Sequence, residues 1–134
     1  MTTVLDASIL AEILVLSPIG ERVEPKIRDA AGWLHLPHLA DIETASVLRG
    51  LALGGILSAE RAGQALEDLH KFPAKRWPST VLFDRIWSLR ENVTAYDANY
   101  IALAERLDAE FITADGKLAR ALVGVAQCEV TVVT

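Results

Sequence analysis

Cysteine is almost absent from this chain of 134 residues, and membrane-directing features are absent too. The single cysteine, Cys128, excludes an internal disulfide and is expected to be a small buried hydrophobic residue. No apolar run approaches the roughly 18–20 residues of a membrane-spanning helix, which argues against a membrane protein. The first residues, Met-Thr-Thr-Val-Leu-Asp, lack the basic and apolar regions of a signal peptide, so we expect a cytoplasmic location.

Length and composition predict one domain, spanning residues 1–134, that is large enough to bury a proper core. Hydrophobic residues make up 51% of the chain, which is high for a domain with a fully solvated surface. We therefore expect a large core of small residues together with some surface that a partner or a second copy covers.

Charge is spread unevenly along the chain. The net charge of −5 argues against broad, charge-driven affinity for nucleic acid. The window 71–90, however, holds five basic residues against one acid and carries +4, which leaves −9 for the remainder. Two divalent cations bound by acids would also contribute +4, so the net charge does not exclude a phosphate-bearing substrate.

Hydrophobic periodicity predicts alternating strands and helices. The expected order is β-α-α-β-α-α-α-α-β-α-β, with a connector at 73–78 between two prolines. This order favours an α/β fold with a mostly parallel sheet that is covered by helices. The expected strands are 2–5, 33–36, 110–113 and 130–133, and the expected helices are 7–16, 21–31, 40–53, one capped by Ser58, one capped by Ser79, 97–107 and 116–122.

Four carboxylates are the main candidates for chemistry: Asp6, Glu43, Asp97 and Asp115. Three of them fall at junctions of predicted elements, and in a parallel sheet such junctions converge on the ligand-binding edge. A cluster of acids at that edge needs cations, and a hard divalent metal bound through oxygen is the usual choice. The pattern therefore predicts a site for a hard divalent metal.

Each carboxylate also has a purely structural interpretation. Asp6 could cap a helix, Thr94-x-x-Asp97 fits a capping box, Asp115 could begin a turn, and Glu43 could be a solvated helical residue. The metal hypothesis rests on their joint placement rather than on any one of them.

Metal-assisted hydrolysis of a phosphodiester suits this residue type. A metal ion polarises a phosphoryl oxygen and activates water, and two ions can stabilise both the attacking and the leaving oxygen. Mg²⁺ takes only one or two carboxylates directly, so four acids could serve two ions, some of them through water. The hydroxyls of Ser8 and Thr113, each two residues from an acid, are expected to orient these carboxylates.

Several short motifs recur in one known family in this order and spacing. They are Val4-Leu5-Asp6-Ala7-Ser8, Glu43 followed by Leu48-Arg49, Thr94-Ala95-Tyr96-Asp97-Ala98, Ala102-Leu103-Ala104, and Thr113-Ala114-Asp115 before Leu118. Over nearly its whole length the chain resembles the PIN-domain ribonucleases of the VapC toxin type.

The resemblance implies a PIN-like α/β/α sandwich and a Mg²⁺- or Mn²⁺-dependent endoribonuclease that acts as the toxin of a type II toxin–antitoxin pair. Asp6, Glu43, Asp97 and Asp115 match the family's acidic quartet, and Thr113 matches its supporting hydroxyl. We expect Asp6 and Asp115 to bind metal directly and the other two acids to complete the site. The implied products carry a 5′-phosphate and a 3′-hydroxyl.

The resemblance also implies partners. Such toxins form homodimers and are silenced by a cognate antitoxin, sometimes in a larger toxin–antitoxin assembly. A segment of the antitoxin lies across the toxin groove and often places a basic side chain near the acids. Asn99 departs from the apolar residue that is commoner two positions after the third acid.

The window 71–90 mixes basic residues with four aromatic ones. Such a mixture can hold single-stranded RNA through phosphate contacts and base stacking. Alternatively, the aromatic residues are core and the basic ones form a solvated face. The candidate RNA contacts are Arg49, Lys75, Arg76 and Arg85, and the aromatic residues are Phe72, Trp77, Phe83 and Trp87.

Other polar residues are given structural roles. His35 and His38 lack the further ligands that a zinc site needs. Asp41, a fifth acid, is expected to cap the helix over 40–53.

Two rival functions remain open. Phosphotransfer through an aspartyl nucleophile at Asp6 would need a second aspartate where this chain has Ser8. A catalytically silent PIN-like module that only binds RNA or protein would be expected to lack acids that are all present here.

Overall fold

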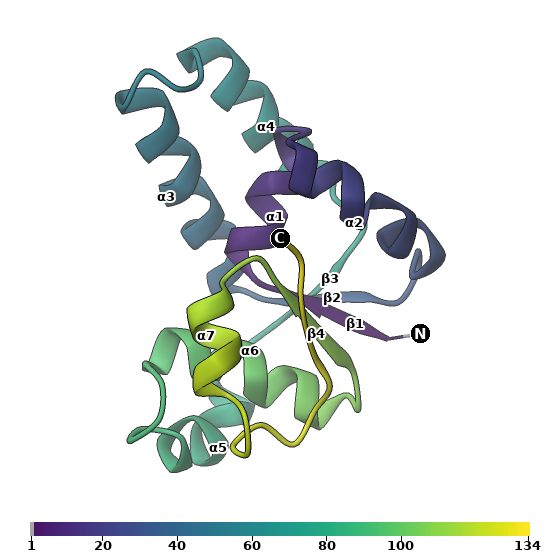
Figure 1. Cartoon of the computed structure of the whole chain (residues 1–134), viewed down its shortest axis with the longest axis vertical. Coiled ribbons are helices and arrows are strands. Elements are labelled where there is room, and N and C mark those ends of the chain that lie inside the picture. Colours follow the sequence, from purple (N-terminus) through teal and green to yellow (C-terminus); the bar gives the residue numbers. More distant parts are fainter. Residues whose placement is uncertain (1) are drawn as a thin grey trace.

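A computed structural model describes residues 2–134. Its centre is a five-stranded sheet in the order β3-β2-β1-β4-β5, in which every neighbouring pair is parallel (Figure 1). The predicted α/β class with a parallel sheet is confirmed. The strands are β1 (Thr3–Leu5), β2 (Leu34–Pro37), β3 (Lys75–Trp77), β4 (Glu110–Thr113) and β5 (Val130–Val132).

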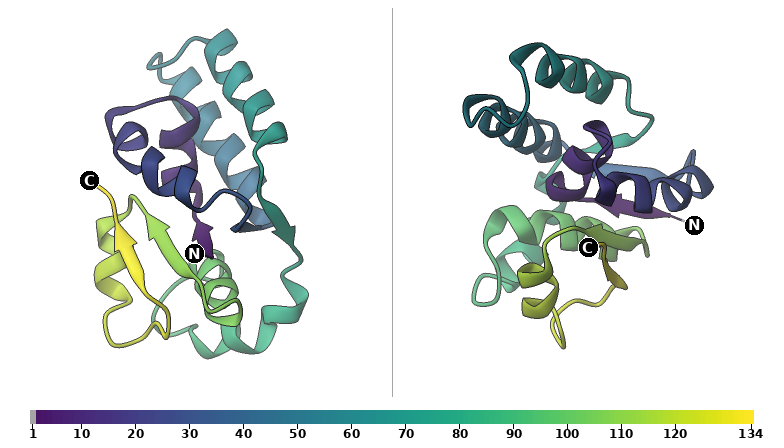
Figure 2. Two further views of the ribbon diagram at one scale, coloured as in Figure 1. Left: turned by 90° about the vertical axis from the view of Figure 1, so that its right-hand side faces the viewer. Right: turned by 45° about the horizontal axis from the view of Figure 1, so that its top comes forward.

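Helices cover both faces of the sheet (Figures 1 and 2). The connections toward β3 run on one face and the connections back toward β4 and β5 on the other, as right-handed crossovers require. The first group comprises α1 (Ala7–Leu14), α2 (Pro18–Asp29), α3 (Leu39–Leu53) and α4 (Ala59–Lys71), and the second comprises the 3-10 turn η1 (Thr80–Leu82), α5 (Phe83–Ser88), α6 (Ala95–Arg106) and α7 (Gly116–Ala121). The α3–α4 hairpin extends away from the sheet (Figure 2).

Strand β3 was not predicted, because it lies within the expected connector at 73–78 and has only three residues. A strand this short carries no readable alternation. It pairs with β2 from His35–Lys75 to Pro37–Trp77 and forms one edge of the sheet.

Helix boundaries follow local capping, and several expectations about boundaries and caps were wrong. Helix α2 begins at Pro18 rather than at 21, because Ser17 accepts a hydrogen bond from the Gly20 N–H and proline suits the first helical turn. Ser79 makes no capping hydrogen bond and instead accepts one from Asn99. Asp41 lies inside the first turn of α3 and pairs with an arginine rather than capping the helix.

Other caps agree with the sequence. The Ser58 hydroxyl accepts from the Arg61 N–H at 3.0 Å at the start of α4. The Thr94 hydroxyl accepts from the Asp97 N–H at 3.2 Å, so α6 begins at Ala95, two residues earlier than expected.

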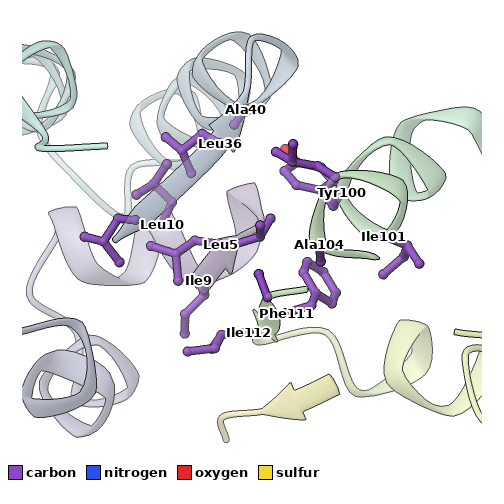
Figure 3. Packing of buried hydrophobic residues seen from close by; sticks show 14 of the residues in the cluster. Leu5, Ile9, Leu10, Leu36, Ala40, Tyr100, Ile101, Ala104, Phe111 and Ile112 are labelled. Atoms are coloured by element: carbon purple, nitrogen blue, oxygen red, sulfur yellow. The ribbon is translucent and has the colours of Figure 1, made fainter. Parts of the chain in front are cut away.

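The core lies between the sheet and the helices on both sides. Figure 3 shows Leu5 and Ile112 of the central strands near Ile9 of α1, and it shows Phe111 of β4 near Tyr100 of α6, with their ring centres 6.2 Å apart. Helices α1 and α2 approach each other closely at Gly20, where an added Cβ would lie 2.2 Å from a backbone oxygen of α1. Within residues 2–134, no helix combines the length and apolar character needed to cross a membrane.

Candidate metal centre

The candidate centre begins where the two central strands end. The register of β1 and β4 pairs Leu5 with Ile112, so the next residues, Asp6 and Thr113, are neighbours across the sheet. From this point α1 leaves toward one face and α7 toward the other (Figure 1). It is the topological switch point at which α/β sheets bind ligands.

Asp6 is buried, with only 5% of the residue exposed, and its carboxylate accepts three hydrogen bonds. The Ser8 hydroxyl donates to Oδ1 at 2.6 Å, and the Ile9 N–H donates to the same atom at 3.1 Å as a helix cap. The Thr113 hydroxyl donates to Oδ2 at 2.5 Å. The Ser8 and Thr113 hydroxyls thus both donate to Asp6, and Asp6 also caps α1.

Burial raises the pKa of Asp6 above its ordinary value of 3.8. The hydrogen bonds from Ser8, Thr113 and Ile9 act in the opposite direction, since they favour the ionised form. The negative charge of Asp97 raises the pKa further. The carboxylate is therefore oriented for a ligand, but no lysine, arginine or histidine among residues 2–134 forms an ion pair with it.

Thr113 links Asp6 to Asp115. Its hydroxyl oxygen accepts from the Asp115 N–H at 3.0 Å while donating to Asp6. Asp115 in turn caps α7 by accepting from the Leu118 N–H at 3.0 Å, and its side chain is exposed. The buried Thr113 hydroxyl is therefore hydrogen-bonded to two of the predicted acidic residues, to the carboxylate of Asp6 and to the backbone N–H of Asp115.

Asp97 approaches this pair from α6. Burial raises its pKa, the Thr94 hydroxyl lowers it, and the charge of Asp115 raises it. Since the charge of Asp97 also acts on Asp6, Asp97 is the acid that joins the other two electrostatically.

Glu43 reaches the site through Tyr100, a residue that the sequence reasoning missed. The Tyr100 hydroxyl donates to Glu43 Oε1 at 2.6 Å. Figure 3 shows the Tyr100 ring extending from α6 toward the start of α3, near Ala40. Burial and the neighbouring carboxylates, Glu43 foremost, raise the pKa of Tyr100, so the hydroxyl stays protonated and remains a donor. The only sequence signal for it was an apolar position on the buried face of its helix.

The donor chemistry fits a hydrated divalent metal. Among residues 2–134, no lysine, arginine or histidine forms an ion pair with any of the four acids. In the same described part of the chain, no three acidic, cysteine or histidine side chains lie close enough to enclose a metal by themselves. Mg²⁺ needs no such cage, because it binds through one or two carboxylates and keeps several waters.

The basic residues of the window 71–90 are mostly engaged within the protein. Arg76 pairs with Asp41 and donates to backbone carbonyls of Leu69, Phe72 and Ala74, and Arg85 pairs with Glu105. These contacts favour structural roles for both arginines, whereas Lys75 lies over the Trp77 ring at 4.1 Å.

The aromatic residues of the window 71–90 differ in their exposure to solvent. Phe83 and Trp87 are 58% and 69% exposed, whereas Phe72 and Trp77 are partly buried against the core. His35 accepts a hydrogen bond from Trp77 Nε1 at 2.9 Å, in keeping with the structural role expected for it.

A recess beside the acids adds cations that the sequence reasoning did not select. Asp97 and Asp115 line it together with Arg90 and Lys117. Arg90 lay in the basic window without being singled out, and Lys117 lies far from that window in sequence.

Comparisons with known proteins extend this description. The family model described as PIN domain matches residues 3–122. The chain is 47% identical over 104 residues to ribonuclease VapC9 of Mycobacterium tuberculosis, which covers 78% of this chain and 80% of that relative. The structure of PAE2754 from Pyrobaculum aerophilum aligns with a TM-score of 0.74 at 21% identity and covers 98% of this chain and 84% of that one. VapBC-5 of M. tuberculosis, a member of a family of toxin–antitoxin systems, aligns with a TM-score of 0.60 at 23% identity over 98% of both chains.

Proposed function

The chain belongs to the PIN-domain family and to its VapC branch, and from this premise we propose that it is a metal-dependent endoribonuclease acting as the toxin of a type II toxin–antitoxin pair. The carrying observation is Asp6, a buried carboxylate that three donors orient and that no cationic side chain among residues 2–134 neutralises. The names of its relatives support ribonuclease activity. The cytoplasmic location expected from the sequence stays a prediction.

The four acids would hold Mg²⁺ or Mn²⁺ with unequal roles. Asp6 and Asp115 are the proposed direct ligands, because the Thr113 hydroxyl donates to the Asp6 carboxylate and accepts from the backbone N–H of Asp115, which holds the two residues next to each other. Glu43 and Asp97 complete the site, directly or through water. When bound, the metal supplies Lewis acidity toward the phosphoryl oxygen and lowers the pKa of water.

The side chains around the acids prepare the site before substrate arrives. Ser8 and Thr113 keep Asp6 oriented and favour its ionised form. Tyr100 directs one oxygen of Glu43, which leaves the other free to face the centre. Such supporting contacts fix the ligands in place and so reduce the reorganisation needed during reaction.

Cleavage of total cellular RNA by purified protein, freed of any antitoxin, tests this proposal. Reactions with Mg²⁺, with Mn²⁺ and with EDTA are compared for the wild type, Asp6→Asn and Asp108→Asn. Asp108 is an exposed acid with positive φ, a conformation that asparagine tolerates, so it is a matched control. We expect metal-dependent cuts with the wild type and Asp108→Asn, and none with Asp6→Asn.

Two results would contradict the proposal. Equal cutting by Asp6→Asn would remove the acid from the reaction. RNA that is bound but left intact in both metals by folded wild-type protein would favour the silent binding module.

We also propose that an antitoxin occupies the groove next to the acids. Ser8 and Asp115 are among the residues that line this groove, so a segment seated there would lie against the site. The rest of its lining is mainly apolar: Ala11, Val15, Ile19, Val47, Leu51, Ile56 and Leu57. Burial of this surface would also account for part of the high hydrophobic content.

Ile56→Asp tests the groove, because Ile56 is 73% exposed and a charge there would oppose an apolar partner. Val123→Asp is the matched control at an 80% exposed position outside the groove. Size-exclusion chromatography of toxin co-expressed with its antitoxin should show a complex that Ile56→Asp dissociates and Val123→Asp leaves intact. Light scattering of the purified toxin should show the homodimer that we also propose, and a monodisperse monomer would contradict it.

A further inference from the structure

The recess beside Asp97 and Asp115 has a cationic wall. Arg90 precedes α6 and Lys117 lies in the first turn of α7, so the two cations come from different parts of the chain. Both side chains are exposed, and among residues 2–134 neither forms an ion pair with a carboxylate. Glu91 also lines the recess and is its one acid apart from Asp97 and Asp115.

Arg90 lies on an exposed tryptophan. Its guanidinium carbon is 4.9 Å from the centre of the Trp87 ring, and its Nη1 donates to the Trp87 carbonyl oxygen at 3.0 Å. Trp87 nevertheless stays 69% exposed, so most of the indole is open to solvent. A planar cation and a planar ring therefore stand together at the rim of a recess that leads to two of the proposed metal ligands.

Helix α5, which carries Trp87, is firmly attached to the domain. Arg85 pairs with Glu105 of α6, with Nε 2.6 Å from the carboxylate, and also donates to the Val125 carbonyl oxygen beyond α7. At the other end, Asn99 of α6 donates to Ser79 at 2.9 Å and secures the segment that leads into η1. Asn99 departs from the family pattern, and this contact gives it a structural role.

A single strand of RNA matches these features in charge and shape. The four acids repel a polyanion, so a substrate strand needs cations close to the site of reaction. Arg90 and Lys117 supply them on the wall that Asp97 and Asp115 share. An exposed indole with a stacked guanidinium offers a surface on which any base can stack.

We propose that Trp87, Arg90 and Lys117 hold the RNA strand next to the acids, Trp87 by stacking on a base and the two cations by contacting phosphates. The proposal rests on the ribonuclease function above and names positioning residues for it. It also replaces Arg76 and Arg85 as candidate RNA contacts, because both of these arginines form ion pairs within the protein.

Binding of a fluorescent twelve-nucleotide RNA of mixed sequence, measured by anisotropy in EDTA, tests the proposal without cleavage. Base stacking on an aromatic side chain contributes about 1–3 kcal/mol, so Trp87→Ala should weaken binding roughly fivefold or more, and Trp87→Phe should retain most of the affinity. Arg90→Gln and Lys117→Gln should each lower the slope of log affinity against log salt by about 0.7, the value of one phosphate contact on a single strand.

Matched controls lie elsewhere on the surface. Trp33 is 59% exposed and precedes β2, at the end of the sheet opposite the acids, so Trp33→Ala should leave RNA affinity unchanged. Arg22, an exposed residue of α2, gives Arg22→Gln as the control for charge.

The outcomes separate this inference from the nuclease proposal. Wild-type protein that fails to bind the RNA, or a Trp87→Ala protein that binds as well as Trp33→Ala, would overturn the inference. So would loss of antitoxin binding by Trp87→Ala with RNA affinity intact. If the wild type cuts RNA and Trp87→Ala binds it normally, only the inference fails. If these variants weaken binding as expected but no preparation cuts RNA with Mg²⁺ or Mn²⁺, the nuclease proposal fails, and what stands is the RNA contact of Trp87, Arg90 and Lys117 without a positioning role in cleavage.

Discussion

The buried hydroxyl of Thr113 should contribute more to stability than any other threonine hydroxyl near the site. It donates to the Asp6 carboxylate at 2.5 Å and accepts from the Asp115 N–H at 3.0 Å. Thr113→Val keeps the shape of the side chain and replaces the hydroxyl by a methyl group. Because a hydrogen bond to a charged group contributes about 1.5–3 kcal/mol, the free energy of unfolding in EDTA should fall by about that amount.

Thr44 offers a control with the same substitution and the same burial. Both residues are 0% exposed, but the Thr44 hydroxyl has no hydrogen-bond partner among residues 2–134. Thr44→Val therefore removes a buried polar group that nothing satisfies, and it should be neutral or stabilising. Urea unfolding of the three proteins gives the comparison. Equal losses in the two variants would refute the reasoning, because packing alone would then explain both.

The effect of Thr113→Val should also depend on pH. The Thr113 hydroxyl favours the ionised form of Asp6 and thus lowers its pKa. Without that hydrogen bond the pKa rises further, so the variant should lose more stability at higher pH, where a larger share of Asp6 is ionised, than in acid. A loss that stays constant across this range would show that the hydrogen bond does not distinguish the two forms of Asp6.

Three other perturbations follow from the same contacts. Tyr100→Phe leaves Glu43 without its donor and should lower metal-dependent RNA cleavage about tenfold or more with the fold retained, as circular dichroism would check; unchanged cleavage would refute the positioning role. In EDTA, the stability that Asp6 and Asp97 contribute is complete below pH 3.8, their ordinary pKa, and is lost as the pH rises through their raised pKa values in the folded protein. The free energy of unfolding should therefore fall over that pH range, and Mg²⁺ in excess of the EDTA should restore part of it. Gly20→Ala forces a Cβ to 2.2 Å from a backbone oxygen and should cost about 1–3 kcal/mol in urea unfolding, and an unchanged midpoint would contradict that close approach.

Much of the fold could be predicted because hydrophobic periodicity and capping residues agree along most of the chain. Ser58 marked the start of α4 and the apolar run at 110–113 marked β4. Strand β3 escaped because three residues between prolines carry no periodic signal, and its place is decided by pairing with β2. Helix α2 begins three residues before the expected range 21–31, because a serine followed by a proline favours a helix start at Pro18.

Some residues of the candidate site could be predicted from the sequence and others could not. Asp6, Ser8 and Thr113 could be related from sequence because each lies at or next to the end of a central strand, where register alone brings them together. Tyr100 could not, since its hydroxyl meets Glu43 only after α3 and α6 pack near one another. Arg76 and Arg85 were misleading for the same reason, because their acidic partners lie 35 and 20 residues away in sequence.

The chemical nature of the cut ends tests the central claim most directly. Wild-type protein is incubated with RNA and Mg²⁺, and the termini at each cut are identified by enzymatic ligation and mass spectrometry. Hydrolysis by water at an acidic metal centre predicts a 5′-phosphate and a 3′-hydroxyl at every cut, with no products in EDTA. A 2′,3′-cyclic phosphate opposite a 5′-hydroxyl would mean that the ribose 2′-oxygen is the nucleophile, and it would contradict the account.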